Sequence, residues 1–321
     1  MQLQRTKAAY AKPKKKPLLS YLKQNYDMYL LLIPGLIFVL IFNIVPLYGI
    51  SIAFKDYNMF AVNGSPFLSI LESPWCGLEH FKKIMGETGF LYAFRNTMII
   101  SVLKIVCIFP IPIIFAILLN EVKSTLFQKG LQTVVYLPHF LSWAVVSGIF
   151  VSLLGSTGSV NHMLEAMGFE KVSFLMNNNT FRWVLIFSDG WKEVGWSSII
   201  YFAAIAGLDQ ECYEAARVDG ANRFQQIWYI TVPGLMPTII LMLILRVGSI
   251  MDAGFGQILA MYNPTVYESA DIIGTYIYRV SLGQLNFSSG TAVGLFNSLI
   301  SLTLVVSTNA LAKKWSGKSI W

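Results

Sequence analysis

The stretch EAARVDGANRFQQIWYITVPGLMP, residues 214–237, is the most polar long segment in the second half of this 321-residue chain, and apolar segments flank it on both sides. Its local pattern predicts two helices joined by a sharp turn. Asp209 is placed to cap the first helix, and Gly220 stands where a left-handed residue commonly ends one. Asn222, with Gln225 three residues later, forms a capping-box pattern that starts the second helix.

This predicted hairpin spans residues 208–233. Three large apolar residues share one face of its second helix by their spacing of three and four: Phe224, Ile227 and Trp228. We expect Phe224 and Trp228 to tie the hairpin to the membrane helices. Pro233 and Pro237 are expected to separate the hairpin from the next apolar segment. The alternative interpretation is an ordinary capped loop with no partner of its own.

Composition places the whole chain in a membrane. Hydrophobic residues make up 55% of the chain and charged residues only 13%, about half the charged share of a soluble domain. The net charge of +7 comes from basic residues in blocks beside apolar runs, which favours a topological signal over nucleic-acid binding. Cys76, Cys107 and Cys212 suggest neither a disulfide framework nor, with the histidines, a metal site.

Six apolar stretches are long enough to cross a bilayer, since a spanning helix needs about 20 mostly apolar residues. They are Tyr29–Phe54, Asn96–Leu119, Leu131–Leu154, Phe181–Ala206, Leu235–Met261 and Thr291–Ala312. The first is too long for the apolar part of a signal peptide, so we interpret it as a retained helix. The sequence therefore predicts an all-α polytopic membrane protein with a six-helix transmembrane domain over residues 29–312.

Lysine and arginine predict the orientation of these helices. The N-terminal tail, residues 1–28, holds seven basic residues, and six spans bring the C-terminal tail, residues 313–321, to the same side. The hairpin lies there too, with Lys123, Lys129, Arg217 and Arg223. By the positive-inside rule both tails and the hairpin are cytoplasmic. The opposite loops, about 55–95, 155–180 and 262–290, are long enough for short surface helices.

The hairpin resembles a known motif. Its residues Glu214, Ala215, Ala216, Asp219, Gly220 and Ala221, followed by Ile230 and Pro233, are similar to the EAA motif of ABC-type importer permeases. The motif's position between the fourth and fifth of six spans also matches. The resemblance implies a type I ABC importer permease fold, in which this hairpin is the coupling helix that docks into a cleft of a separate ATPase subunit. It makes Glu214 the docking position and Gly220 the turn position.

The resemblance extends over most of the chain. FRNTMIISVLK (94–104), YLPHFLSWAVVSGIF (136–150), DGWKEVGWSSIIYFAAIAGL (189–208) and DAGFGQIL (252–259) are similar to segments of carbohydrate-uptake permeases. The C-terminal SGKSIW adds to a likeness to permeases for aldouronates or rhamnogalacturonan fragments. The resemblance implies a multi-pass protein of the bacterial cell membrane. It also implies several partners: a second homologous permease, two ATPase subunits that hold ATP and Mg, an external solute-binding protein and an oligosaccharide cargo.

Charges within the predicted spans are candidates for function, because each is costly in lipid. Asp189, Lys192 and Glu193 share one face of the fourth span, with Trp196 one turn further and Trp191 nearby. Arg246 in the fifth span has no evident local partner, and Lys104 lies in the second. Mixed aromatic and polar side chains suit a sugar path, and a guanidinium suits a uronate carboxylate. The alternative is that these charges pair to hold helices together, within the chain or with a partner subunit.

Other functions fit the sequence less well. A permease for peptides or phosphate esters is the nearest alternative. An ion-coupled secondary transporter predicts internal inverted repeats, and the chain shows no convincing self-similarity. No triad or dyad spacing connects His80, His139 and His162 with a nucleophile or carboxylate, so the chain is not expected to be an enzyme or to bind a cofactor itself.

Overall fold

The computed structural model describes residues 24–62 and 65–317, and these residues are almost entirely helical. The pairing of Lys55 with Trp75 is an isolated bridge, and no strand occurs among the described residues. The predicted all-α class is therefore confirmed for this part of the chain. The predicted tails fall largely outside it, since residues 1–23 of the first tail and 318–321 of the second are not described. Contacts divide the chain into two units, one up to Ser51 and one from Ile52.

The first unit is an apolar helix. It comprises α2 (Tyr26–Val39), a π-helical turn (Leu40–Ile44) and the start of a 3-10 segment (Val45–Phe54). None of the residues of α2 is buried, and the whole run Tyr26–Phe54 has the length and composition of a membrane span. Exposed Leu, Ile and Phe side chains on every face are stable in lipid and costly in water.

The second unit begins with two short helices, α3 (Pro66–Glu72) and α4 (Glu79–Gly86), and then a long apolar pair. Helix α5 (Thr88–Cys107) continues almost directly into α6 (Pro110–Asn120). The apolar run that they form starts at Thr88, eight residues before the predicted start at Asn96. Pro110 lies in the first turn of α6, where the missing N–H costs nothing.

The third predicted span, Leu131–Leu154, is wrong as a single helix. Helix α7 (Thr125–Tyr136) passes into a 3-10 turn (Leu137–Phe140) and stops, and α8 (Trp143–Leu154) starts anew before α9 (Ser159–Ala166). Pro138 lies within the turn. The hydroxyl of Ser142 accepts the N–H of Val145 and so caps α8, as a serine at this position commonly does.

Helix α10 (Asn178–Ala206) occupies the fourth predicted span and packs against α6, α7 and α13. A Cβ at Gly195 would lie 2.1 Å from the carbonyl oxygen of Val135 in α7, so the two helices cross with backbones nearly touching. Among the described residues five helical stretches have the length and composition of a membrane span, and α10 is not one of them. It has 29 residues but carries Asp189, Lys192 and Glu193 in its apolar part.

The fifth predicted span, Leu235–Met261, also differs. Helix α12 (Arg223–Gln226), a π-helical turn (Ile227–Thr231) and α13 (Val232–Gly248) form one uninterrupted helix, so the prediction that Pro233 separates the hairpin from the span is wrong. The N–H of Val232 bonds to the carbonyl of Ile227, five residues back. This wider turn accommodates the proline that follows.

The chain then turns at residues 249–254 and continues through α14 (Phe255–Met261), a 3-10 turn (Pro264–Val266), α15 (Tyr267–Ala270) and α16 (Ile273–Tyr278). Helix α16 is not the surface helix expected of this loop, because Ile273 and Tyr276 are buried. Arg279, in the π turn Arg279–Gly283, pairs with Asp271 at 2.6 Å, and this carboxylate raises the pKa of Arg279. Helix α17 (Phe287–Ser316) ends the described chain.

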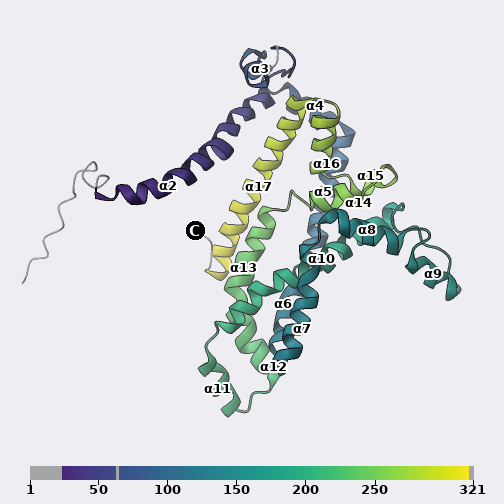
Figure 1. Ribbon diagram of the computed structural model, residues 1–321. Coiled ribbons are helices and arrows are strands. Elements are labelled where there is room, and N and C mark those ends of the chain that lie inside the picture. The colour runs from purple at the N-terminus through teal and green to yellow at the C-terminus, as the bar shows by residue number, and fades with distance from the viewer. Residues whose placement is uncertain (1–23, 63–64, 318–321) are drawn as a thin grey trace, which may run out of the picture. The chain divides into compact units, whose positions relative to one another are not determined.

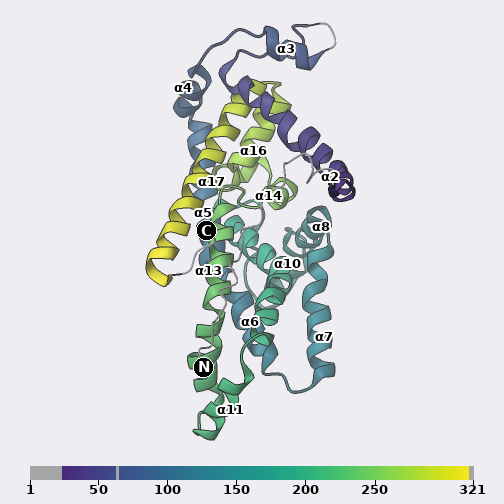
Figure 2. The same ribbon diagram turned by 90° about the vertical axis from the view of Figure 1, so that its left-hand side faces the viewer.

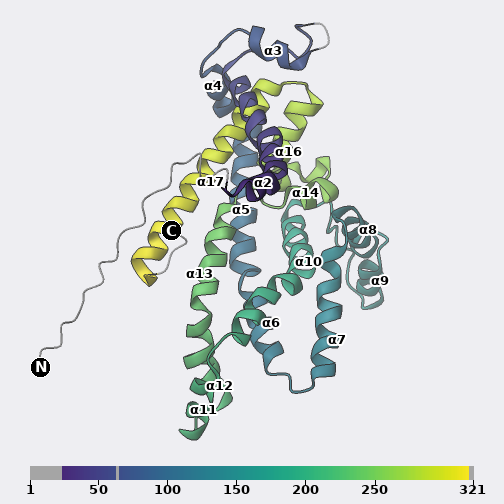
Figure 3. The same cartoon turned by 60° about the vertical axis from the view of Figure 1, so that its left-hand side comes forward.

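Within the second unit, the hairpin helix α11 (Gln210–Val218) and the α4–α16 region lie at opposite ends (Figures 1 and 2). Helices α5, α6, α10 and α13 run between these ends (Figure 3). One buried cluster joins α5, α8, α10 and α14, and a second joins α5, α16 and α17. The turn at 249–254 follows α13 in the middle of this bundle, where it meets α5 and α10.

Candidate functional site

The turn at residues 249–254 is a break in helical backbone held by side chains of α5. The hydroxyl of Ser101 donates to the carbonyl oxygen of Ile250, and the ammonium of Lys104 donates to that of Ala253 at 3.1 Å. Ala253 and Gly254 both have positive φ, 50° and 87°. Non-helical backbone at this depth of a membrane protein occurs where protein or a water-filled cavity surrounds it. The turn is therefore a candidate functional site.

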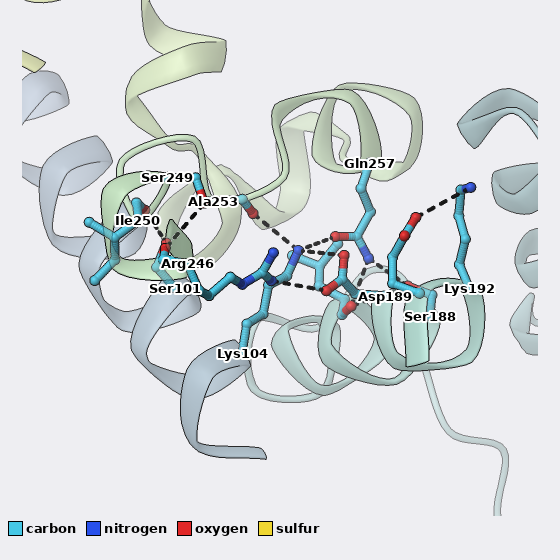
Figure 4. A network of polar contacts seen from close by, with 12 residues as sticks. Ser101, Lys104, Ser188, Asp189, Lys192, Arg246, Ser249, Ile250, Ala253 and Gln257 are labelled. Atoms are coloured by element: carbon cyan, nitrogen blue, oxygen red, sulfur yellow. Dashed lines mark hydrogen bonds and ion pairs between the residues drawn. The ribbon is translucent and has the colours of Figure 1, made fainter. Parts of the chain in front are cut away.

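Lys104 is the centre of a buried polar network that joins α5, α10 and α14 (Figure 4). Besides Ala253, its ammonium bonds to Asp189 Oδ1 at 3.1 Å and to Gln257 Oε1 at 2.6 Å. The other oxygen of Asp189 lies 3.6 Å from the guanidinium of Arg246. One carboxylate thus faces two cations, which is how a charge of each sign is tolerated away from water.

Gln257 fixes the orientation of this network. Its side chain is fully buried, and its amide nitrogen donates to the carbonyl oxygen of Leu185 and to the hydroxyl of Ser188, both at 2.7 Å. With both amide donors used on α10, the amide oxygen is directed at Lys104. No sequence pattern singled out Gln257 or Ser101, because each acts on a segment far away in the chain.

A cavity of about 220 Å³ opens beside the network, and a second of about 250 Å³ adjoins it. The two share five lining residues, which are Asp189, Glu193, Ser197, Arg246 and Ser249. The first also reaches Trp143 and the turn itself, whereas the second is bounded by apolar residues of α6 and α13. Together they form a space between α5, α10 and α13 whose shared lining is polar and charged, and the Arg246 side chain in this lining is 43% exposed.

Three of the six residues predicted for a cargo path line this space: Asp189, Glu193 and Arg246. Arg246 has no partner on its own helix, as expected, and it pairs instead with Asp189 of α10.

The other three lie elsewhere around α10. Lys192 donates to the carbonyl oxygen of His139 and lies 3.4 Å from Glu193. Trp196 stacks on the His139 ring at 4.4 Å, and Trp191 packs edge-on to Phe150. These contacts tie α10 to the residues around the break between α7 and α8.

The hairpin forms a second distinctive site at the far end of the unit. Asp209 caps α11 by accepting the N–H of Glu211 at 2.9 Å, and Asn222 and Gln225 form the predicted capping box. Gly220 has a φ of 78°. The predicted caps and the left-handed glycine are thereby confirmed.

The predicted ties between the hairpin and the rest of the chain are wrong. Phe224 and Trp228 stack on each other and are 72% and 59% exposed, so they are not buried against another helix of the described residues. The hairpin is instead fixed by polar contacts. Two of these contacts lie within the hairpin: Tyr213 and Thr231 share a hydrogen bond of 2.8 Å, and the amide of Gln226 donates to the carbonyl of Ala221. Arg223 pairs with Glu121, which lies outside the hairpin.

The outer surface of the hairpin is largely exposed in the described part of the chain. Glu214, Ala215, Asp219 and Gly220 are exposed, as is the apolar Val218 at 89%, while Ala216 and Ala221 are partly buried.

Fold and sites together define a polytopic helical membrane protein with a polar internal cavity and a projecting hairpin. Residues 108–317 match the family described as "Binding-protein-dependent transport system inner membrane component". The chain belongs to this family. The match covers the hairpin and all of the cavity except its α5 side, and it confirms the resemblance to ABC importer permeases.

Relatives and a solved structure agree with this assignment. The chain is 42% identical over 313 residues to the polygalacturonan/rhamnogalacturonan transport system permease protein YteP of Bacillus subtilis (strain 168), covering 97% of this chain and 95% of that protein. It is 41% identical over 301 residues to protein LplB of the same organism, covering 94% and 92%. A crystal structure of a bacterial ABC transporter involved in the import of the acidic polysaccharide alginate matches with a TM-score of 0.86 and 39% identity, covering 94% of this chain and 100% of that one.

The chain is therefore a permease subunit of a binding-protein-dependent carbohydrate importer and a multi-pass component of the bacterial inner membrane. It is a transport component and not an enzyme, in keeping with its family.

Proposed function

We propose that this chain is one of two related permease subunits of an importer for oligosaccharides that carry uronate groups. Two comparisons support an acidic cargo. The relative YteP is named for polygalacturonan and rhamnogalacturonan, and the related crystal structures are described for the acidic polysaccharide alginate, one of them with a periplasmic protein bound to an alginate pentasaccharide. A periplasmic or extracellular binding protein would deliver the cargo here too.

The proposed topology has six spans, with α10 as the fourth and both termini in the cytoplasm. The basic residues of the two tails and of the hairpin support this orientation. The buried pairing of Asp189 with Lys104 supports α10 as a span despite its charges, because charges in such helices face the bundle interior and pair there.

The hairpin, residues 208–233, is proposed as the coupling element. Glu214, Ala215, Ala216, Asp219, Gly220 and Ala221 would face a cleft of a partner ATPase, which holds the ATP and Mg. Val218 adds apolar contact area at the tip. Closure of two ATPase subunits would then rock the two permeases between inward-open and outward-open states, so that chemistry on one chain moves cargo through another.

The cargo path is proposed to pass through the polar cavity. Carboxylates such as Glu193 accept hydrogen bonds from sugar hydroxyls, and the exposed guanidinium of Arg246 can bind a uronate carboxylate with two parallel bonds. Because a second permease supplies the other wall, the cavity of one chain is half of the path. Lys192, Trp191 and Trp196 support the path from the other faces of α10.

The accessible Arg246 in a polar cavity is the observation that carries the cargo assignment. Copurification of the intact transporter, followed by mass spectrometry of its bound ligand, tests it. We expect a uronate oligosaccharide together with a second permease and an ATPase. A neutral oligosaccharide would overturn the uronate assignment alone, whereas a peptide or phosphate ester would overturn the carbohydrate assignment.

A further inference from the structure

The ammonium of Lys104 has no free donor. Its three N–H groups meet Asp189 Oδ1 at 3.1 Å, the carbonyl oxygen of Ala253 at 3.1 Å and Gln257 Oε1 at 2.6 Å, which is the full donor capacity of a lysine. The side chain is 2% exposed. Lys104 therefore has no donor left to bind cargo, although it lines the cavity.

Arg246 is in the opposite situation. It lies 3.6 Å from Asp189 Oδ2, a distance that suits an ion pair but exceeds the length of a good hydrogen bond. Its guanidinium makes no hydrogen bond to any described residue, and the side chain lines the cavity and is 43% exposed. Arg246 is thus held near Asp189 by charge alone, with its donors available.

Whether Arg246 can move away from Asp189 depends on how the Asp189 carboxylate is neutralised afterwards. Its side chain is 8% exposed, and a buried carboxylate without a cation is strongly destabilised. If Arg246 were its sole partner, moving the guanidinium to a cargo carboxylate would strand that charge. Lys104 removes this obstacle because it remains bonded to Asp189 Oδ1.

We propose that Lys104 is a positioning residue for acidic cargo: it keeps Asp189 neutralised so that Arg246 can exchange Asp189 for a uronate carboxylate. The exchange replaces one carboxylate partner of Arg246 by another, and no proton moves. This inference rests on the proposed uronate cargo, and it assigns Asp189 a role as a placeholder in the empty state. Gln257 and the carbonyl of Ala253 supply the rigidity, because they hold the ammonium from two further sides.

The test compares uptake of trigalacturonate with uptake of its methyl ester, which has the same sugars without the charges. The complete transporter is reconstituted in liposomes with binding protein saturated by either compound. In Lys104→Met, Asp189 keeps only Arg246, so uptake of the acid should fall about tenfold while uptake of the ester stays within about twofold. The double variant Lys104→Met/Asp189→Asn frees Arg246 again and should restore the acid to within about threefold.

Two controls separate positioning from a structural effect. Ser101→Ala removes another bond to the same turn without touching Asp189, and the acid-to-ester ratio should stay that of wild type. Equal loss of both compounds in Lys104→Met, or a double variant that transports the acid no better than Lys104→Met, overturns the proposal. If Lys104→Met does not assemble, the double variant decides by itself: acid uptake near wild type supports the proposal, and a tenfold loss relative to the ester overturns it.

Arg246→Gln, measured in parallel, separates this inference from the proposed function. Selective loss of acid uptake in Arg246→Gln with an unchanged ratio in Lys104→Met overturns the positioning role alone. Equal loss of acid and ester in Arg246→Gln, or no acid uptake by the wild type, overturns the uronate assignment and the positioning role with it.

Discussion

Gly254 shows how one residue is fixed by two independent constraints. Its φ of 87° lies in the left-handed region, which costs other residues about 1–2 kcal/mol. In addition, a Cβ there would lie 2.5 Å from the ammonium of Lys104. The glycine is thus required both by the turn and by the lysine that organises it.

We expect Gly254→Ala to destabilise the protein by more than the roughly 1–2 kcal/mol of backbone strain, because the ammonium must also move away from its partners. Thermal unfolding of the purified transporter measures the change. Gly294→Ala in α17 is the matched control, since nothing lies within 4 Å of its Cβ position. Unchanged stability in Gly254→Ala would show that the turn rearranges without cost.

At the scale of elements, the hairpin was the most predictable part of the chain. Caps and turns depend on residues within three or four positions of each other, so Asp209, Asn222 and Gly220 could be assigned from sequence. The contacts between the hairpin and the neighbouring helices could not be predicted in this way. Phe224 and Trp228 have the spacing of a buried face, yet they remain exposed in the single chain.

The coupling role makes a sharp prediction for this element. Gly220→Val strains the turn by about 1–2 kcal/mol, and Glu214→Lys reverses the exposed charge proposed to meet the ATPase. Both should leave the permease inserted and expressed, while ATPase copurification or its stimulation by loaded binding protein falls. Leu126→Ala, a change at a similarly exposed site on α7, should leave both unchanged. Normal stimulation and uptake in both hairpin variants would rule the hairpin out as the coupling element.

The internal breaks escaped sequence reasoning for a physical reason. Leu235–Met261 is apolar enough to predict one continuous span, but its helix stops where Ser101 and Lys104, about 150 residues earlier in the chain, bind the carbonyl groups of the turn. The same distance hid the pairing of Arg246 with Asp189. Charges within spans could be recognised as candidates, and Asp189, Glu193 and Arg246 do line the cavity, but their partners depend on tertiary packing.

At the scale of the whole molecule, the status of α10 determines which parts face which side. Residues 168 and 220 lie before and after this helix. If α10 crosses the bilayer they are on opposite sides, and if it does not they are on the same side. Helix α10 is not among the five described stretches whose length and composition suit a membrane span, so its crossing of the bilayer is a matter for measurement.

Alkaline phosphatase fusions test the topology directly, because the enzyme is active outside the cytoplasm. A fusion at Gly168 should be active and one at Gly220 inactive. Equal activities would show that α10 does not span, and the reversed pattern would place the hairpin outside the cell. Expression levels of the two fusions, measured by immunoblotting, provide the control.

The uninterrupted helix from Arg223 to Gly248 has a mechanical consequence. A helix of 26 residues is about 39 Å long at 1.5 Å per residue, and the π turn lets it pass Pro233 without a flexible joint. It therefore acts as a lever with the hairpin at one end and Arg246 near the other. In the proposed coupling, a tilt of about 10° about one end of this helix would displace its other end by about 7 Å, so movement of the hairpin would change the space around Arg246.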